Sequence, residues 1–284
     1  MRKIVTGIMA VLLTGTQVFA ADLYQQPEPA PIEAPEITVA ESSGWYLRGD
    51  AGYAFNHLKG AKFYQGGFSG SDAEFDSAKL RDAFTLGAGV GYQVNNYLRT
   101  DLTFDYLFRS KFEGSTTGEG ADFGACIGPC TSRDRTSLTA YSLLANAYVD
   151  LGTYGSITPY LGAGIGGTHV KWNNLKNTSC ADDGSGCDDT VEHKGKGSWR
   201  FTYALMAGAS IDVTCNLKAD VGYRYRHVEG GDMFGFAENG GPGSDKGFDV
   251  HEARVGARYL FSGCADQAYV PAAAEPAPQS FVYK

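Results

Sequence analysis

The chain has 284 residues, a formal net charge of −8, 38 glycines and 13% aromatic residues. This composition excludes two classes of protein. A bundle of membrane-spanning helices needs several apolar stretches of about 20 residues, whereas only one short stretch, Ile4 to Phe19, is a candidate. A disordered chain is poor in aromatic residues, and this chain has 16 Phe, 17 Tyr and 3 Trp.

Residues 1–20 have the three-part layout of a secretory signal peptide. Arg2 and Lys3 precede an apolar stretch, which ends at the small residue Ala20. We therefore expect export through the general secretory pathway. A single membrane anchor is the alternative, but the apolar run is short for a bilayer. Loss of Arg2 and Lys3 leaves a still more acidic mature chain, which argues against a nucleic-acid partner.

Proline-containing segments flank one central body. Residues 21–43 contain Pro27, Pro29, Pro31 and Pro35 together with acidic residues, a composition typical of an extended linker. Residues 262–284 form a similar C-terminal tail. The body between them runs from residue 44 to residue 261.

Apolar residues in this body recur at every second position, which is the period of half-buried strands. Eight strands are predicted: Trp45–Phe55, Phe84–Val94, Leu98–Arg109, Tyr141–Asp150, Ile157–Gly166, Trp199–Asp212, Leu217–Arg226 and Glu252–Phe261. Short turns follow the second, fourth and sixth strands, and loops of more than 20 residues follow the first, third, fifth and seventh. This alternation predicts an all-β, eight-stranded antiparallel up-and-down transmembrane β-barrel with long extracellular loops and short periplasmic turns.

The polar faces of these strands carry both signs of charge. They place the following residues in a predicted interior charge network: Arg48, Asp50, Arg99, Asp101, Asp105, Arg109, Asp150, Arg200, Asp212, Lys218, Asp220, Arg224, Arg226, Glu252, Arg254 and Arg258. In a water-soluble barrel or sandwich the same charges would face solvent. Lipid is favoured outside because aromatics such as Trp45, Phe55 and Trp199 stand near strand ends, as in interfacial girdles. The strands, at about 9 to 13 residues, are also long enough to cross a bilayer when tilted.

Eight strands leave an interior barely wide enough for its own side chains. We expect ion pairs to plug it, because each unpaired interior charge costs several kcal/mol. Inward glycines at positions 87, 89, 91, 162, 164 and 166 free some space. They make room for large arginines and for Tyr160, or they line a narrow water path.

Six cysteines in an exported protein indicate three disulfides, although six thiols permit 15 pairings. Proximity in sequence favours Cys126 with Cys130 and Cys180 with Cys187, which leaves Cys215 with Cys264. The last pair would share the turn-bearing rim and close a loop of about 50 residues, a contribution of roughly 4 kcal/mol. Zinc binding is the alternative to a disulfide for Cys126 and Cys130, but no further ligand stands at a zinc-site spacing.

Three segments resemble strands of a known family. They are Gly44–Tyr53 (GWYLRGDAGY), Thr158–Gly166 (TPYLGAGIG) and Ala219–Tyr225 (ADVGYRY). They are similar to the first, fifth and seventh strands of the porin-family and opacity-type outer-membrane proteins of Gram-negative bacteria, which share an OmpA-like transmembrane barrel. The resemblance covers residues 44–261. The proline-rich stretch is similar to that of alphaproteobacterial surface antigens of this type.

This resemblance implies a structural, adhesive or immunogenic surface role, with no catalytic residues and no cofactor. The implied partners are outer-membrane lipid and lipopolysaccharide, the outer-membrane assembly machinery, and a host or surface ligand at the loops. A small diffusion pore is the alternative. A lipid-modifying enzyme is more remote, because none of His57, His169, His193, His227 and His251 stands in a His-x-Ser pair.

Two loop features have a structural interpretation as well as a catalytic or metal-binding one. His227 with Glu229, and His251 with Glu252, are interpreted as rim residues and not as an acid–base pair. Four acids surround the third loop's cysteines: Asp182, Asp183, Asp188 and Asp189. They carry calcium-type ligands but lack the calcium-loop spacing, so we interpret them as a solvated acidic loop.

Overall fold

The computed structural model describes residues 43–65, 71–120, 125–237 and 241–264. These residues fall within one compact unit, residues 40–284. Every named element in them is a β-strand, and no helix among them is long and apolar enough to span a membrane. The predicted signal peptide, nearly all of the linker and most of the C-terminal tail lie outside the described residues, so those boundaries stay predictions.

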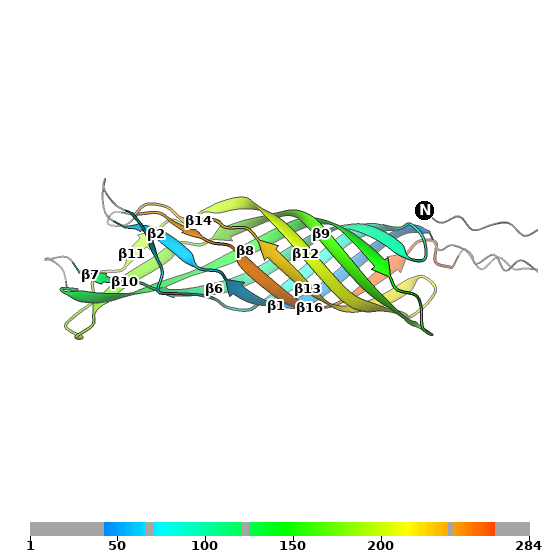
Figure 1. Ribbon diagram of the computed structural model, residues 1–284, viewed down its shortest axis with the longest axis horizontal. Helices are drawn as coiled ribbons and strands as arrows, with labels where there is room; N and C mark the ends of the chain where they lie inside the picture. The colour runs from blue at the N-terminus through cyan, green and yellow to red at the C-terminus, as the bar shows by residue number, and fades with distance from the viewer. Residues whose placement is uncertain (1–42, 66–70, 121–124, 238–240, 265–284) are drawn as a thin grey trace, which may run out of the picture. The chain divides into compact units, whose positions relative to one another are not determined.

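Eight long strands form a closed antiparallel ring. They are β1 (Gly44–Leu58), β5 (Ala83–Gln93), β6 (Leu98–Ser115), β8 (Pro129–Asp150), β9 (Ile157–Trp172), β12 (Gly197–Asp212), β13 (Leu217–Val228) and β16 (Phe248–Leu260). Each strand pairs with its neighbours in this order, and β16 pairs back to β1. Figure 1 shows these strands running obliquely beside one another. The prediction of an all-β antiparallel arrangement of eight strands is confirmed.

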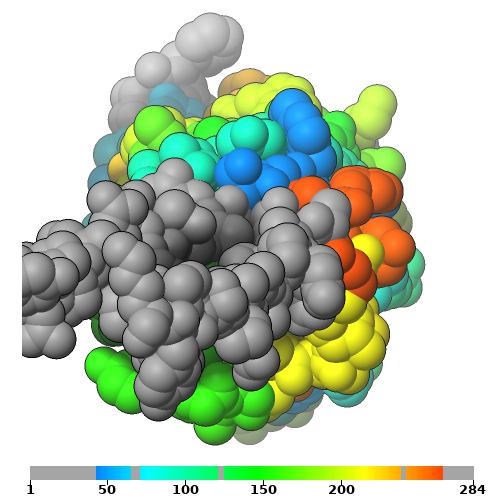
Figure 2. Space-filling view, turned by 90° about the vertical axis from the view of Figure 1, so that its right-hand side faces the viewer, coloured from blue at the N-terminus to red at the C-terminus, as the bar shows by residue number. Residues whose placement is uncertain are grey.

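The turns at one rim are held by side chains of the turn residues. The Asn95 carboxamide oxygen accepts hydrogen bonds from the backbone N–H groups of Tyr97 and Leu98, at 2.9 and 2.8 Å. The Thr214 hydroxyl likewise accepts from Leu217 N–H at 3.0 Å. Such local bonds favour tight turns over continued strands. In the view onto this end, the first and last strands, blue and orange, lie side by side (Figure 2), as the β1–β16 pairing requires.

The remaining strands lie at the opposite end of the ring (Figure 1). A separate four-stranded sheet has the order β14 (Gly231–Phe234), β15 (Gly243–Asp245), β2 (Ala61–Gln65), β3 (Ser71–Glu74). Four more short strands add to the ring strands: β4 (Ser77–Leu80) on β6, β7 (Thr117–Glu119) and β10 (Leu175–Ala181) on β8, and β11 (Val191–His193) on β10. The long connections are therefore built largely of paired strand.

Several ring strands are longer than the sequence predicted. The predicted length of about 9 to 13 residues is wrong for five of them: β1 has 15 residues, β6 has 18, β8 has 22, and β9 and β12 have 16 each. The extra residues continue the ladder toward the loop end. There the side chains alternate with the same period but with the opposite polarity, so a search for outward apolar residues misses them.

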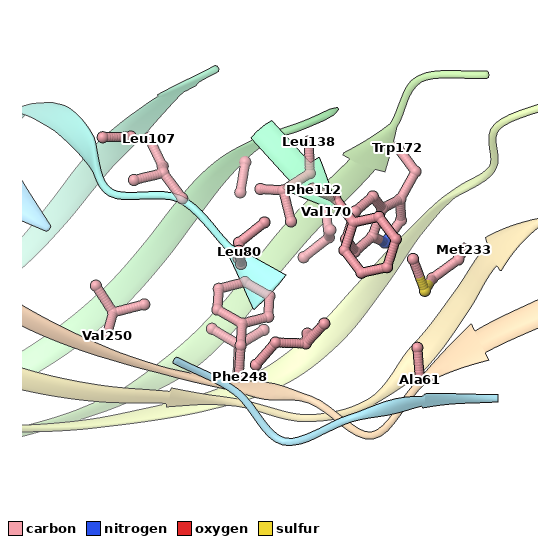
Figure 3. Close-up of a cluster of buried hydrophobic side chains, with 14 of the residues drawn as sticks. Ala61, Leu80, Leu107, Phe112, Leu138, Val170, Trp172, Met233, Phe248 and Val250 are labelled. Atoms are coloured by element: carbon pink, nitrogen blue, oxygen red, sulfur yellow. The ribbon is translucent and has the colours of Figure 1, made fainter. Parts of the chain in front are cut away.

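Strand β8 shows this inversion of polarity most clearly. In its turn-side part Leu143 is 45% exposed, whereas Asp150, on the inner face, is 6% exposed. In its loop-side part Leu138 on the inner face is fully buried and Arg135 on the outer face is exposed. The ring thus has a turn-side section that is apolar outside and ionic inside, and a loop-side section that is polar outside and apolar inside. Figure 3 shows the buried apolar cluster of the loop-side section, which includes Phe112 and Trp172.

Candidate functional site: the filled interior and the loop-bearing end

A continuous chain of ion pairs crosses the interior of the turn-side section. The Arg224 guanidinium donates from Nη1 to Asp105 Oδ2 at 2.8 Å and from Nη2 to Glu252 Oε2 at 2.7 Å. Asp105 also lies 3.4 Å from Arg254 Nη2, which contacts Asp50 Oδ2 at 3.1 Å. Four strands, β1, β6, β13 and β16, contribute these charges. Arg48 pairs with Asp50, also on β1, at 2.8 Å and with Asp101 on β6 at 2.7 Å. Mutual pairing makes such buried charges tolerable.

A second ionic group lies nearer the turns. Arg258 Nε donates to Asp220 Oδ2 at 2.6 Å, and the Ser210 hydroxyl donates to Asp220 Oδ1 at 2.6 Å. Arg99 Nε donates to Asp150 Oδ1 at 3.0 Å. The aromatic rings nearby add cation–π contacts: the Arg99 guanidinium lies 4.2 Å from the Tyr148 ring centroid and 4.5 Å from that of Tyr160. These contacts tie the interior arginines to the wall on several sides.

Glycines on the inner face provide the room for these large groups. A Cβ at Gly91 would clash with Tyr46 Cζ, and one at Gly162 would lie 2.5 Å from Tyr148 Cδ1. At Gly87 it would lie 2.5 Å from Asp105 Oδ1. Any larger residue at these positions would displace a ring or a carboxylate of the interior network.

Two small cavities lie beside these side chains. The cavity beside Arg48, Asp50, Tyr148 and Tyr160 has a volume of about 10 Å³, room for roughly one water molecule. A recess of about 100 Å³ at the turn-bearing rim is lined by residues that include Asp150 and Arg258. Beyond the ionic section, the apolar cluster of Figure 3 fills the loop-side section. Two layers of opposite polarity therefore occupy the interior in series.

Three residues of the predicted interior network lie elsewhere. Arg109 is exposed, because β6 carries an extra residue between Leu107 and Ser110, which turns both Phe108 and Arg109 outward. Asp212 and Lys218 form a partly exposed pair at the turn-bearing rim, 2.7 Å apart, where the β12–β13 ladder ends and solvent reaches the strands. The rest of the set is buried.

Arg200 is buried but joins a different group. Its Nη1 donates to Asp245 Oδ1 of β15 at 2.7 Å, and Trp172 Nε1 donates to Asp245 Oδ2 at 3.2 Å. This contact fastens the loop sheet to the ring. Burial raises the pKa of Asp245, and Arg200 partly offsets that shift. No sequence pattern pointed to Asp245, which lies in a glycine-rich loop. Tyr46 and Tyr148, by contrast, stand two residues from inward charges, a spacing that could have identified them as interior residues.

The structure pairs all six cysteines. The bonds join Cys126 to Cys130, Cys180 to Cys187, and Cys215 to Cys264, with sequence separations of 4, 7 and 49. The first two lie at the loop end, where Asp188 Oδ1 accepts hydrogen bonds from Ala125 N–H and Cys126 N–H at 2.9 and 3.0 Å. The third links the β12–β13 turn to the residues after β16.

The acids of the third loop are used as hydrogen-bond acceptors. Asp182 accepts from the Thr131 hydroxyl at 2.7 Å, and Asp183 accepts from Ser185 N–H at 2.8 Å. The Ser185 backbone bond lowers the pKa of Asp183. Among the described residues, no three acids, histidines or cysteines stand close enough together to hold a metal ion.

The histidine pairs lie on the outer wall. His227 Nδ1 is 2.6 Å from Asp249 Oδ1, and its Nε2 is 3.7 Å from Glu229. His251 Nδ1 lies 2.6 Å from the Tyr223 hydroxyl. Glu252, next to His251 in sequence, is buried on the opposite face of β16, so the wall separates these two side chains.

A closed ring with apolar residues outside and paired charges inside is the construction of a β-barrel in a membrane, where all backbone groups must bond within the protein. The family model described as outer membrane protein beta-barrel domain matches residues 32–261. The chain belongs to this family, and it is an integral protein of the outer membrane.

Similar sequences occur in other bacteria. An uncharacterised protein of Brucella abortus is 36% identical over 282 residues, which cover 89% of this chain and 96% of that protein. A candidate adhesin of Rickettsia conorii is 31% identical over 221 residues, or 76% of this chain and 80% of the relative.

Solved structures of low sequence identity are also similar. Neisserial surface protein A is 19% identical, with 78% of this chain and 100% of that chain covered and a TM-score of 0.39. The outer membrane protein OprG of Pseudomonas aeruginosa is 13% identical, with coverage of 78% and 97% and a TM-score of 0.44.

Proposed function

We propose that this protein is a closed barrel that serves the cell envelope as a structural element and presents its loop end as an interaction surface outside the cell. The observation that carries the proposal is the filled interior. Buried ion pairs occupy the ionic section around a cavity of about 10 Å³, with a recess of about 100 Å³ at the turn-bearing rim, and a packed apolar cluster follows on the loop side. A barrel whose interior is occupied by an ionic layer and then by an apolar layer is suited to holding a surface in place and not to passing solutes.

The loops are held in a defined conformation, as an interaction surface requires. Two short disulfide loops, a four-stranded sheet and the strands β10 and β11 stand on the rigid ring. Loops held on a rigid scaffold are common sites of recognition. The relative named as a candidate adhesin supports the same role. In the proposed topology the long loops face outward and the short turns face the periplasm. Lipopolysaccharide surrounds the wall of the barrel, and the outer-membrane assembly machinery inserts the chain.

An adhesion assay tests the surface role. A non-adherent Gram-negative strain displays either the full chain or a variant in which residues 178–190 are replaced by a short Gly-Ser linker. These residues are the end of β10 and the segment that leads to β11. We expect the full chain to increase attachment to host cells and the tip variant to attach less, while both give a heat-modifiable band in gels. Attachment no higher than that of the vector control would contradict the proposal.

Conductance separates this role from that of a small diffusion pore. We expect the refolded protein to give no stable current steps in a planar bilayer. The control is a variant that lacks parts of both layers and should conduct. It has Phe112 and Trp172 changed to glycine, and Arg224, Asp105 and Glu252 changed to alanine. Reproducible current steps from the unaltered protein would favour the pore.

A further inference from the structure

The wall of the ring has a seam on the loop side of Ala54. The β1–β5 ladder runs from Gly44 opposite Gln93 to Ala54 opposite Ala83 and stops there. The chain before Ala83 leads instead into β4, which among the described strands pairs with β6 alone. In the described part of the chain, one residue of β1 bridges the seam with hydrogen bonds: the Asn56 backbone N–H donates to Asp82 Oδ1 at 3.1 Å, and the Asn56 side-chain Nδ2 donates to Arg81 O at 2.9 Å.

A groove of about 630 Å³ lies along this seam. Its floor is apolar, because it includes Leu58 and Leu80, which belong to the buried cluster of Figure 3. Its rim is polar and includes His57, Lys79 and Arg81. The groove is therefore amphipathic.

The groove opens next to the lipid-facing surface. Phe55 follows Ala54 on β1 and is 50% exposed, and Phe84 follows Ala83 on β5 and is 66% exposed. The ring of Tyr53 packs against both, with centroid distances of 5.1 Å to each. Exposed aromatics of this kind mark the boundary between hydrocarbon and headgroups. The seam thus begins where the apolar outer wall ends, at the depth of the lipid headgroups.

The extra residue in β6 adds a base at the same depth. It turns Arg109 outward beside the segment that carries Arg81, since Ser110 donates its hydroxyl to Arg81 O and Arg81 N–H donates to Lys111 O at 2.8 Å. Arg81 pairs with Glu113 at 3.2 Å. In the chain as described, the side chains of Arg109, Lys111 and Lys79 have no hydrogen-bond or ion-pair partner. The described acids beside these four bases are Asp82 and Glu113, so the bases outnumber them.

We propose that this seam binds an anionic, phosphate-bearing lipid of the outer leaflet. Arg81, Arg109 and Lys111 hold the phosphate, and one acyl chain lies in the groove against Leu58 and Leu80. Guanidinium groups bind phosphate through paired hydrogen bonds. The apolar floor of the groove shields the acyl chain from the polar headgroup layer. The inference rests on the proposed orientation, in which the loop end faces outward, and it adds a binding site on the barrel wall below the loops.

The experiment uses the full chain refolded in detergent micelles, with diphosphoryl lipid A and its dephosphorylated form as probes. Native mass spectrometry measures the lipid retained. The test variant is R81Q/R109Q/K111Q. The matched control is K171Q/K176Q/K194Q, which removes the same charge from exposed positions on β9, β10 and the segment after β11. We expect at least about a tenfold loss of lipid A retention in the test variant, none in the control, and weak retention of the dephosphorylated lipid by all three proteins.

Equal retention by the test variant and the unaltered chain would overturn the proposal, as would an equal loss in both triple variants. A lipid A carrying a diazirine in an acyl chain locates the hydrocarbon. Crosslinks concentrated on His57 to Lys59 and on Lys79 to Arg81 are expected, and crosslinks spread evenly around the wall would contradict the site. The test variant should still display its loops and attach in the adhesion assay, so failure here is distinct from failure of the surface role.

Discussion

At the scale of single residues, the interior is an ion-pair network in which each member has a position that its neighbours enforce. Arg224 bonds to Asp105 and Glu252 at once and is 1% exposed. Removing one partner from a buried pair is costly because the other charge stays behind without compensation. The network should therefore be sensitive to loss of its central member and insensitive to changes at the outward Arg109.

The variant Arg224→Met tests this. We expect the free energy of unfolding to fall by about 3 to 5 kcal/mol, because Asp105 and Glu252 lose their shared donor. Denaturant titration in micelles, followed by the heat-modifiable gel shift, measures the change. The control Arg109→Met should stay within about 0.5 kcal/mol of the unaltered chain. Equal stabilities of the two variants would contradict the role of the network.

Inner and outer glycines should respond differently to the same substitution. Gly162→Ala places a Cβ 2.5 Å from Tyr148 Cδ1 and should cost about 1 to 3 kcal/mol through overpacking. Gly49→Ala meets no atom within 4 Å and should be neutral or slightly stabilising. Thermal unfolding of the two variants under identical conditions gives the comparison. A Gly162→Ala protein as stable as the Gly49→Ala protein would contradict tight packing around Tyr148.

At the scale of elements, the alternation of residues was enough to predict all eight ring strands. It could not predict where polarity inverts, since inward apolar and outward apolar residues recur with the same period of two. Nor could it predict the extra residue in β6, and continuing the alternation through Phe108 placed Arg109 on the wrong face. The interior site was predictable where alternation is unbroken, as at Asp101 and Asp105, and not where a loop supplies the partner, as Asp245 does for Arg200.

Deletion of Arg109 tests the bulge directly. The shortened strand keeps Leu107 and Ser110 on the inner face, since the extra residue is the one removed. We expect the variant to fold, with a change in stability of no more than about 1 kcal/mol. Deletion of Phe104, in the regular part of the ladder, shifts every later residue to the other face and should abolish the folded, heat-modifiable band. A folded Phe104 deletion would contradict the assigned register.

The loop-side part of β8 should become more stable in mild acid. Burial raises the pKa of Asp134, although bonds from Ser132 and Asn177, at 2.6 and 2.7 Å, partly offset it. The folded state then holds a proton more tightly than the unfolded state, so stability falls as pH rises from the ordinary Asp value of about 3.9 through the raised one. Hydrogen exchange of the β8–β10 amides should show this trend, and Asp134→Asn should flatten it. An opposite slope would contradict the assignment.

At the scale of the whole barrel, two sections of opposite polarity meet at one depth. The turn-side section needs hydrocarbon outside and the loop-side section needs water, so the position of the bilayer follows from the side chains alone. This arrangement also explains why the protein combines a wall rich in exposed Phe, Leu and Val with an acidic composition.

Accessibility of spin labels tests this division most directly. Single cysteines for labelling can replace outward residues without competing thiols, because all six native cysteines are bonded. Labels at Leu86, Leu143 and Val255 should collide with oxygen, which concentrates in hydrocarbon, and not with a water-soluble nickel chelate. Labels at Lys111, Arg135 and Lys171 should show the reverse. Nickel access at Leu86, Leu143 and Val255 in a bilayer would contradict the account.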